Sequence, residues 1–358
     1  MSSQNKMVVA IVCGGTSSEH EVSCISASGV LSAIDRELFD PIVIGIKKSG
    51  GVVKLPDDYP LSVQGEKLPT IAEDLEELPL GLHSLISEEF HVEIVFPVLH
   101  GSYGEDGEFQ KECEALNLRY VGSGVEASAL AMEKGAAKRA FSQAGLNVVP
   151  GVVINKEEWV SHPDSAISTI EAFIDGEFPI FVKPSRSGSS RGTHKVKSLD
   201  QLKAACDDAF TYDTLVLIEK AIDAREIECA VLDELSSSGN RQIVVSPPGE
   251  IKISEEHEFY DFESKYLDGA TSVEIPAAID PSLSEEIRKK AMEAFLALDC
   301  LGYARVDFFL DRKSNELYIN EINTIPGFTP TSVYPLLMKA AGVSYRDLIT
   351  ALLTFASL

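Results

Sequence analysis

A continuous apolar run near the N-terminus constrains the fold more than any other stretch. Residues 7–15 read MVVAIVCGG, an uninterrupted apolar segment that ends in two glycines. Such a run, without the alternation of a half-buried strand, is typical of a strand covered on both faces of a parallel sheet and turning toward a helix. Residues 21–34 then carry small and apolar side chains at helical spacing, and the stretches 41–46 and 92–101 predict further buried strands. Because strands alternate with helical segments, we predict an open α/β sheet through about residue 122, with ligands at the carboxyl ends of its strands.

The charge balance limits the partners of the chain. The 358 residues include 31 Lys and Arg against 56 Asp and Glu, a formal net charge of -25, which argues against nucleic acid or an anionic membrane. An anionic substrate must therefore be held by a local group of Lys and Arg, helped by metal. No segment approaches the about eighteen apolar residues of a membrane helix, and the N-terminal run is shorter than a secretory signal, so we expect a soluble cytoplasmic protein. The six cysteines form no CxxC pair and are expected to be small core residues.

The rest of the chain divides into further units. Residues 123–154 predict two helices and an exit through Pro150, and the chain then becomes rich in strands. We place the unit boundaries near residues 122 and 213. Residues 47–90 predict an irregular connection with a short hairpin.

A loop rich in serine and glycine carries the clearest phosphate signal. Residues 182–192 read VKPSRSGSSRG, in which Gly188 and Gly192 allow the backbone to approach an anion and Lys183 adds a cation at the end of a strand. The lysine precedes the glycines, so this is not the GxxxxGK[ST] loop. The alternative interpretation is a flexible hairpin tip.

The segment 304–323, ARVDFFLDRKSNELYINEIN, predicts an antiparallel hairpin with polar side chains on one face. Alternation places Arg305 and Asp307 on one face of the first strand, and Glu321 and Asn323 on one face of the second. The register that puts Asp307 and Glu321 together gives an all-oxygen cluster suited to Mg²⁺. The alternative is a solvated hairpin face, which the apolar neighbours VDFF and YINEI disfavour.

Several motifs together resemble a known family. Three are typical of the ATP-grasp fold, in which two α+β subdomains grip a nucleotide: KPSRSGSS, LIEKAI followed by REIECAVL, and RVDFFLD followed by YINEINTIPGFT. Others resemble D-alanine:D-alanine ligases and occur in that family's order along nearly the whole chain: GGTSSEHEVS, LHGSYGEDG, YVGSGVEASALAMEK, FYDFESKYLDG and EINTIPGFTPTSVYP. So many motifs in order exclude a chance match.

The resemblance implies a fold that is part α/β and part α+β, an ATP-grasp fold preceded by a Rossmann-like (pre-ATP-grasp) domain. Its units would be an N-terminal α/β substrate-binding domain over 1–122, a central ATP-grasp subdomain over 123–213, and a C-terminal ATP-grasp subdomain over 214–358 with a lid loop and the metal site. The implied reaction joins two D-alanines through an acyl phosphate, releases ADP and phosphate, and supplies D-alanyl-D-alanine for peptidoglycan. A cytoplasmic homodimer is implied as well.

The resemblance also assigns residues to ATP and metal. The metal ligands would be Asp307, Glu321 and Asn323, with Glu321 bridging two Mg²⁺ ions or Mn²⁺ in their place. The lysines that contact phosphate would be Lys134, Lys183 and, from the lid, Lys265, while Glu219 would contact adenine and Glu226 the ribose. The chain has MEK at residues 132–134 where the family more often has MDK. This difference should affect ATP binding little if the lysine makes the contact.

A second group of residues is assigned to the two amino acids. Glu19 resembles the carboxylate that receives the ammonium of the first D-alanine, and His100 resembles a histidine beside the same substrate, with a capping or core role as its alternative. Arg305 and the backbone N–H of Gly327 would stabilise the oxyanion of the tetrahedral intermediate. Ser332 matches the residue that holds the carboxylate of the second substrate.

The lid and the second subsite bear on water exclusion and specificity. Tyr266 matches a lid tyrosine that joins Ser189 and Glu19 in a hydrogen-bonded triad, and closure matters because an acyl phosphate hydrolyses in water. Val333 stands where ligases that make D-alanyl-D-lactate usually carry Arg. Its apolar side chain favours D-alanine as the second substrate and leaves D-serine open, because an apolar pocket rejects an added hydroxyl only weakly.

Three alternative functions were weighed. A dehydrogenase is disfavoured because VCGGTSSE lacks the full GxGxxG spacing. A non-catalytic ATP-grasp nucleotide-binding protein stays open on fold alone, although the complete set of matched residues argues against it. A ligase for D-alanine and D-serine or D-lactate is the nearest enzymatic alternative.

Overall fold

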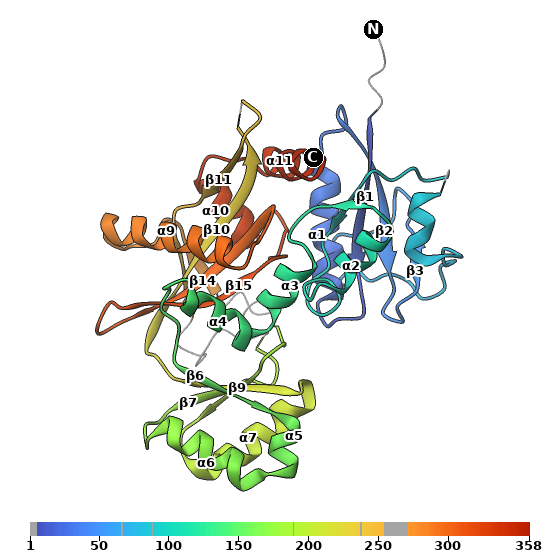
Figure 1. Ribbon diagram of the computed structural model, residues 1–358. Coiled ribbons are helices and arrows are strands. Elements are labelled where there is room, and N and C mark those ends of the chain that lie inside the picture. The colour runs from blue at the N-terminus through green and yellow to red at the C-terminus, as the bar shows by residue number, and fades with distance from the viewer. Residues whose placement is uncertain (1–5, 66, 88, 189, 237, 254–270) are drawn as a thin grey trace.

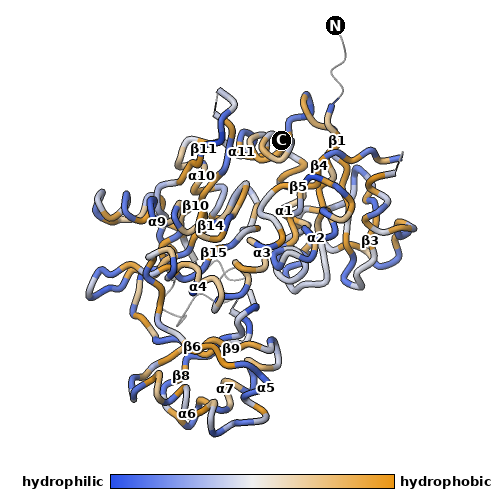
Figure 2. The backbone as a smooth tube through the Cα atoms, in the orientation of Figure 1, coloured by the Kyte–Doolittle hydropathy of each residue, from blue (hydrophilic) through white to orange (hydrophobic). Residues whose placement is uncertain are grey.

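Three sheets organise the structure, a computed structural model that describes residues 6–65, 67–87, 89–188, 190–236, 238–253 and 271–358. The N-terminal sheet, the central sheet and the C-terminal sheet form three lobes around a common centre (Figure 1). Hydrophobic positions concentrate along the strands and the inward sides of the helices, whereas the outer loops are hydrophilic (Figure 2).

The N-terminal sheet has the predicted open α/β form. Its strands run in the order β3-β2-β1-β4-β5, with only β3 antiparallel to its neighbour. The bounds are β1 Met7–Gly14, β2 Phe39–Ile46, β3 Val52–Lys54, β4 Ile94–Pro97 and β5 Arg119–Tyr120. Alternate residues of β1 enter different cores: Val9 and Ile11 pack under α1 (His20–Ala33), whereas Ala10 and Val12 face α2 (Glu108–Ala115). Burial on both faces explains the unbroken apolar run.

The central sheet is antiparallel, in the order β6-β9-β7-β8. Its strands are β6 Gly151–Asn155, β7 Ile180–Pro184, β8 His194–Val196 and β9 Leu215–Lys220, and its helices are α5 Lys156–Ser161, α6 Pro163–Ile174 and α7 Leu199–Tyr212. The helices cover one face and share a core with it. The other face is left for the cleft, and the serine- and glycine-rich loop connects β7 to β8 as predicted.

The C-terminal sheet runs β13-β12-β10-β14-β15, with β11 also paired to β10, and its pairs are antiparallel. The strands are β10 Ala224–Leu235, β11 Arg241–Val245, β12 Gly249–Ile253, β13 Thr271–Glu274, β14 Tyr303–Asp311 and β15 Leu317–Asn323. The helices of this part are α3 Val125–Met132, α4 Lys134–Gln143, α9 Pro281–Ala297, α10 Val333–Ala340 and α11 Tyr345–Ala356. One sheet face packs on α3, α4 and α9, and the other carries α10 and α11 at one end and the cleft at the other.

Packing across the expected boundaries ties the lobes together. Residues 123–149, expected in the central subdomain, hold α3 and α4, whose apolar faces pack on the C-terminal sheet. Strand β9, expected beyond residue 213, pairs with β6 and β7 of the central sheet. Helix α11 inserts into the core between α1 and β10. The chain therefore enters the central sheet near residue 150 and leaves it near residue 222. The division into three functional units stays a prediction.

Several smaller expectations can be compared with the structure. The apolar stretch 92–101 holds a strand only at β4, because it turns into a loop after Pro97. Residues 47–90 contain β3, which forms a hairpin with β2, and a 3-10 helix, η1 (Gly81–Ile86). All six cysteines are buried thiols. Within the described ranges, no helix has the length and apolar character needed to cross a membrane.

Candidate active site

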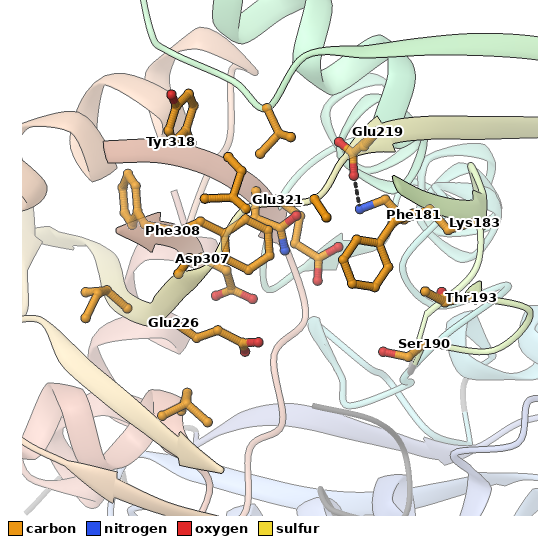
Figure 3. Close-up of a pocket in the computed structure, with 18 of the residues that line it drawn as sticks. Phe181, Lys183, Ser190, Thr193, Glu219, Glu226, Asp307, Phe308, Tyr318 and Glu321 are labelled. Carbon is orange, nitrogen blue, oxygen red and sulfur yellow. Dashed lines mark ion pairs between the residues drawn. The ribbon is translucent and has the colours of Figure 1, made fainter. Parts of the chain in front are cut away.

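A cleft of about 910 Å³ separates the central sheet from the C-terminal sheet. Alternation along β7 turns Phe181 and Lys183 into this cleft while Ile180 and Val182 enter the core. Glu226 and Asp307 approach from the opposite wall (Figure 3). A nucleotide-sized space thus lies between two walls that both carry cations and carboxylates.

Two buried lysines converge on Glu219 at the floor of the cleft. Glu219 is 3% exposed, and its two oxygens pair with Lys138 at 2.6 Å and with Lys183 (Figure 3). Burial raises the pKa of Glu219, but the two lysine charges outweigh it and leave the pKa below its usual value. The carboxylate is therefore ionised and held in one orientation.

The carboxylates of the hairpin meet as the favoured register predicts. Asp307 lies directly opposite Glu321, and Arg305 lies opposite Asn323. A bulge after this pair leaves Asn320 as the extra residue in β15, so the register moves by one between Asp307 and Phe308.

Two cations lie against these carboxylates. Arg305 binds Asp307 through Nε and Nη2, both at 2.7 Å. The Nζ of Lys134 lies 3.3 Å from Glu321 and donates to the carbonyl of Ser187 at 2.9 Å. A cation is thus paired with each of the two acids.

The fit of this group to a divalent cation rests on its donor chemistry. Asp307, Glu321 and Asn323 offer only oxygen, the ligand that Mg²⁺ prefers. The Oδ1 of Asn323 already accepts from the backbone of Ile325 at 2.9 Å and retains a second lone pair. Within the ranges that the structure describes, no three His, Cys, Asp or Glu side chains are grouped closely enough to hold a metal by themselves. The residues fit a cation that takes its remaining ligands from phosphate and water.

A second pocket of about 540 Å³ opens beside the first. Its lining includes the predicted substrate residues Glu19, His100, Gly327, Ser332 and Val333. The two pockets share lining residues Lys134, Gly188, Arg305 and Glu321. The phosphate end of one site and the amino-acid site therefore meet at the same side chains.

Glu19 is placed for a cation in this second pocket. It lies at the start of α1 and is 9% exposed. A Cβ placed on Gly101 would lie 3.1 Å from its Oε2, and a Cβ on Gly188 would lie 3.7 Å from the same atom. The serine- and glycine-rich loop therefore reaches Glu19.

His100 lines the pocket with its ring while its nitrogens bond to the protein. Nδ1 lies 3.0 Å from the carbonyl of Ile325, which can only accept, so Nδ1 carries the proton. Nε2, 3.0 Å from the hydroxyl of Ser26, then accepts from it. Burial lowers the pKa of His100, which agrees with a neutral ring that ties α1 to the loop before Gly327.

Ser332 and Val333 stand at the beginning of α10. Ser332 is the residue before the helix, and its hydroxyl oxygen accepts from the backbone of Thr329 at 3.1 Å. Gly327 faces the same hydroxyl, because a Cβ on it would lie 3.2 Å from Ser332 Oγ. The first turn of α10 directs backbone N–H groups and the positive end of the helix dipole toward this side of the pocket.

Some predicted site residues cannot be placed. Ser189, Lys265 and Tyr266 lie outside the described residues, so the triad and the lid stay predictions. Lys134 is described, and the residue before it has a local role: Glu133 caps α4 by accepting from the backbone of Ala136 at 3.0 Å. The glutamate of MEK thus caps the helix that begins at Lys134, and the low cost expected of this departure stays a prediction.

Four residues that line these two pockets or contact a lining residue were missed in the sequence. They are Lys138, Glu228, Ser26 and Glu105. Glu105 lies in the second pocket with its Oε1 4.0 Å from His100 Nδ1, and burial followed by the charge of Glu19 raises its pKa to about 8. Glu105 and Glu228 stand within the motifs LHGSYGEDG and REIECAVL. Lys138 and Ser26 stand in neither motif, and their partners are distant in sequence.

Two antiparallel sheets face each other across a cleft that is lined by lysines and carboxylates. This arrangement defines the class of ATP-grasp enzymes. The chain belongs to the D-alanine:D-alanine ligase family, since the family's N-terminal domain model matches residues 8–123 and its C-terminal domain model matches residues 140–354. The protein is accordingly an ATP-dependent ligase.

Known relatives cover the chain almost end to end. The D-alanine:D-alanine ligase of Paenarthrobacter aurescens strain TC1 is 43% identical over 97% of this chain and 94% of its own length. D-alanine:D-alanine ligase A of Bradyrhizobium diazoefficiens is 41% identical over 98% and 95%.

Solved structures agree with these relatives. The VanG D-Ala:D-Ser ligase of Enterococcus faecalis superposes with a TM-score of 0.80 at 32% identity, covering 98% of this chain and all of that chain. The D-alanine:D-alanine ligase of Coxiella burnetii gives 0.78 at 30% identity over 98% and 94%. The ATP-grasp fold expected from the sequence is confirmed.

Proposed function

We propose that the protein joins two D-alanines to D-alanyl-D-alanine with ATP, through an acyl phosphate that the second amine attacks. The observation that carries the proposal is the pair of adjoining pockets with Lys134, Arg305 and Glu321 on the boundary between them. A carboxylate held at Glu19's pocket would face the terminal phosphate of a nucleotide in the larger cleft. This is the geometry that phosphoryl transfer to a carboxylate needs.

The larger cleft is assigned to ATP. Glu219 is proposed to lie at the adenine and Glu226 at the ribose, while Lys183 and Lys134 contact phosphate. Lys183 is paired with Glu219, which holds its charge in the cleft where the phosphates would bind. Positioned cations of this kind supply most of the catalysis in phosphoryl transfer.

Asp307, Glu321 and Asn323 are the residues proposed to hold magnesium, with manganese as a substitute. Bound there, the metal would neutralise phosphate charge during transfer. The strand register supports this assignment, because it places two carboxylates directly opposite each other on neighbouring strands. Lys134 adds a positive charge beside Glu321.

The second pocket is assigned to the two amino acids. Glu19 would receive the ammonium of the first D-alanine, and the guanidinium of Arg305 with the N–H of Gly327 would stabilise the oxyanion formed when the second amine attacks. Ser332 and the start of α10 would hold the carboxylate of the second substrate, since a helix N-terminus favours an anion. Ser189, Lys265 and Tyr266 complete the proposal as a lid that excludes water.

The test is phosphate release from ATP and Mg²⁺ with D-alanine, D-serine, D-lactate and L-alanine, offered singly and in pairs, with products identified by mass. We expect release that requires D-alanine, with D-alanyl-D-alanine as the product. Arg305→Ala should lose turnover, whereas Arg346→Ala should keep it because Arg346 pairs with Asp35 away from both pockets. If no pair of D-amino acids supports phosphate release, the proposal is contradicted.

The same assay distinguishes the second acceptor. The structural similarity to a D-Ala:D-Ser ligase and the small apolar Val333 at the pocket make D-serine the alternative second substrate. A mixed product with D-serine would keep the mechanism and change the specificity. The proposal includes the cytoplasmic location and the homodimer that the family resemblance implies.

A further inference from the structure

Glu228 is a buried carboxylate in the nucleotide cleft for which the proposed mechanism has no role. It lies on β10, where Ile227 and Cys229 point into the core and Glu228 turns to the cleft face. Its side chain is 4% exposed. A carboxylate buried this deeply is costly unless a cation accompanies it, so its partner identifies its role.

The sheet aligns Glu228 with the two carboxylates of the proposed metal site. Glu228 is directly opposite Asp307 on β14, and Asp307 is directly opposite Glu321 on β15. Three acids therefore form a row across three adjacent strands. Among the described residues, Arg305 and Lys134 are cations that contact this row.

Arg305 is held between two members of the row. Its Nε and Nη2 each lie 2.7 Å from an oxygen of Asp307, and the same Nε lies 3.1 Å from Glu228 Oε2. The short bidentate contact binds Asp307, and the longer one keeps Glu228 within reach.

We propose that Glu228 positions Arg305, holding its guanidinium at the boundary of the two pockets when the oxygens of Asp307 turn to a divalent cation. The inference rests on the proposed function of Arg305 and Asp307. A divalent cation at Asp307 withdraws that carboxylate from Arg305 and repels the guanidinium. Without Glu228, Arg305 would lose its anchor at the moment when it has to face the reacting carboxyl group.

The experiment compares Glu228→Gln and Glu228→Asp with Asp233→Asn. Asp233 is a matched control because it is a fully buried acid on the same strand, bound to Arg241 at 2.7 Å, and lines neither pocket. Binding of Mn²⁺ together with ADP is measured by electron paramagnetic resonance, which needs no turnover. The kcat value and the KM values for ATP and for D-alanine are measured separately. Thermal unfolding checks that each variant folds.

Glu228→Gln should lower both kcat and Mn²⁺ affinity by about 10-fold to 100-fold, as loss of an outer partner of a metal ligand does. KM for D-alanine should stay near that of the wild type, Glu228→Asp should recover part of the loss, and Asp233→Asn should change stability alone. In an Arg305→Ala background, Glu228→Gln should change Mn²⁺ affinity far less, because the two residues act together.

An equal loss of Mn²⁺ affinity in both backgrounds would overturn the inference, since Glu228 would then act only through its charge. Wild-type turnover with D-alanine tests the proposed function separately, so the two failures are distinguishable.

Discussion

At the scale of single residues, non-local partners decide what each polar group does. Ser26 and His100 lie 74 positions apart, and His100 and Ile325 lie 225 apart, yet the three form one buried chain. The carbonyl of Ile325 selects the tautomer of His100, and that tautomer selects Ser26 as a donor. A histidine expected at the substrate therefore also fixes the loop that carries Gly327.

Ser26→Ala should uncouple this chain. The buried Nε2 of His100 would lose its partner, so we expect a loss of about 1–3 kcal/mol in the free energy of unfolding. A loop displaced near the reacting atoms should also lower kcat, by roughly tenfold or more. Ser23→Ala is the control, because Ser23 is equally buried on α1 but binds Val98 and Gly14 instead of His100. A kcat loss of the same size in both variants would contradict the positioning role.

Glu105 should make stability depend on pH. Its pKa of about 8 lies above the usual carboxyl value of 4.5, so the folded protein retains a proton that the unfolded chain has lost between these values. The associated stability is present below about pH 4.5 and is lost as pH rises through about 8.

In the ligand-free protein, Glu105→Gln should therefore become more stable than the wild type across this window, by up to about 4 kcal/mol at its upper end. Denaturant unfolding at pH 5 to 8 measures the difference. Glu108→Gln, at an exposed position of the same segment, is the control. A difference that does not change with pH would show that Glu105 ionises as it does in the unfolded chain.

At the scale of elements, the β14–β15 hairpin shows how one extra residue sets the chemistry of a strand. Ile319 and Ile322 are both buried, although strict alternation would place them on opposite faces. The bulge at Asn320 resolves this conflict and turns Glu321 and Asn323 to the site. The bulge sets the register between the two strands, and alternation alone does not reveal it.

Glu321→Gln should weaken the proposed metal site while leaving the hairpin intact. We expect a fall of about 10-fold to 100-fold in Mn²⁺ affinity and a large loss of kcat, because one charged ligand disappears. Glu316→Gln, at the exposed turn of the same hairpin, should change neither. Normal Mn²⁺ affinity in Glu321→Gln would remove Glu321 from the site.

At the scale of the whole molecule, two of the three lobes share a hydrophobic core and the third has its own. Helix α11 buries Leu348 and Leu352 between the N-terminal sheet and β10, so these two lobes have a common core. The central sheet has a separate core with its own helices, in which Ile170 is fully buried. We therefore expect the central lobe to open locally apart from the other two.

Two truncations should separate these cores. Leu352→Ala and Ile170→Ala should each cost about 2–5 kcal/mol as buried large-to-small changes. Hydrogen exchange should rise in both β1 and β10 for Leu352→Ala, but mainly in the central sheet for Ile170→Ala. Faster exchange of all three sheets in both variants would indicate a single cooperative unit.

The sequence by itself determined what depends on local pattern. The unbroken apolar run at residues 7–15 identified a doubly covered strand. The composition of 182–192 predicted a loop suited to phosphate. Alternation in 304–323 put Arg305 with Asp307, and Glu321 with Asn323, on one face of each strand. Such patterns are readable because side-chain direction follows from backbone period alone.

Only the tertiary structure decided the packing of the lobes and the pairing of buried charges. It assigned α3 and α4 to the C-terminal sheet, brought Lys138 to Glu219, and placed Glu228 against Arg305. A buried charge is tolerated only where its partner lies, and these partners come from elements distant in the chain. The residues that support the site are therefore set by the fold, while the residues expected to do the chemistry stand in recognisable motifs.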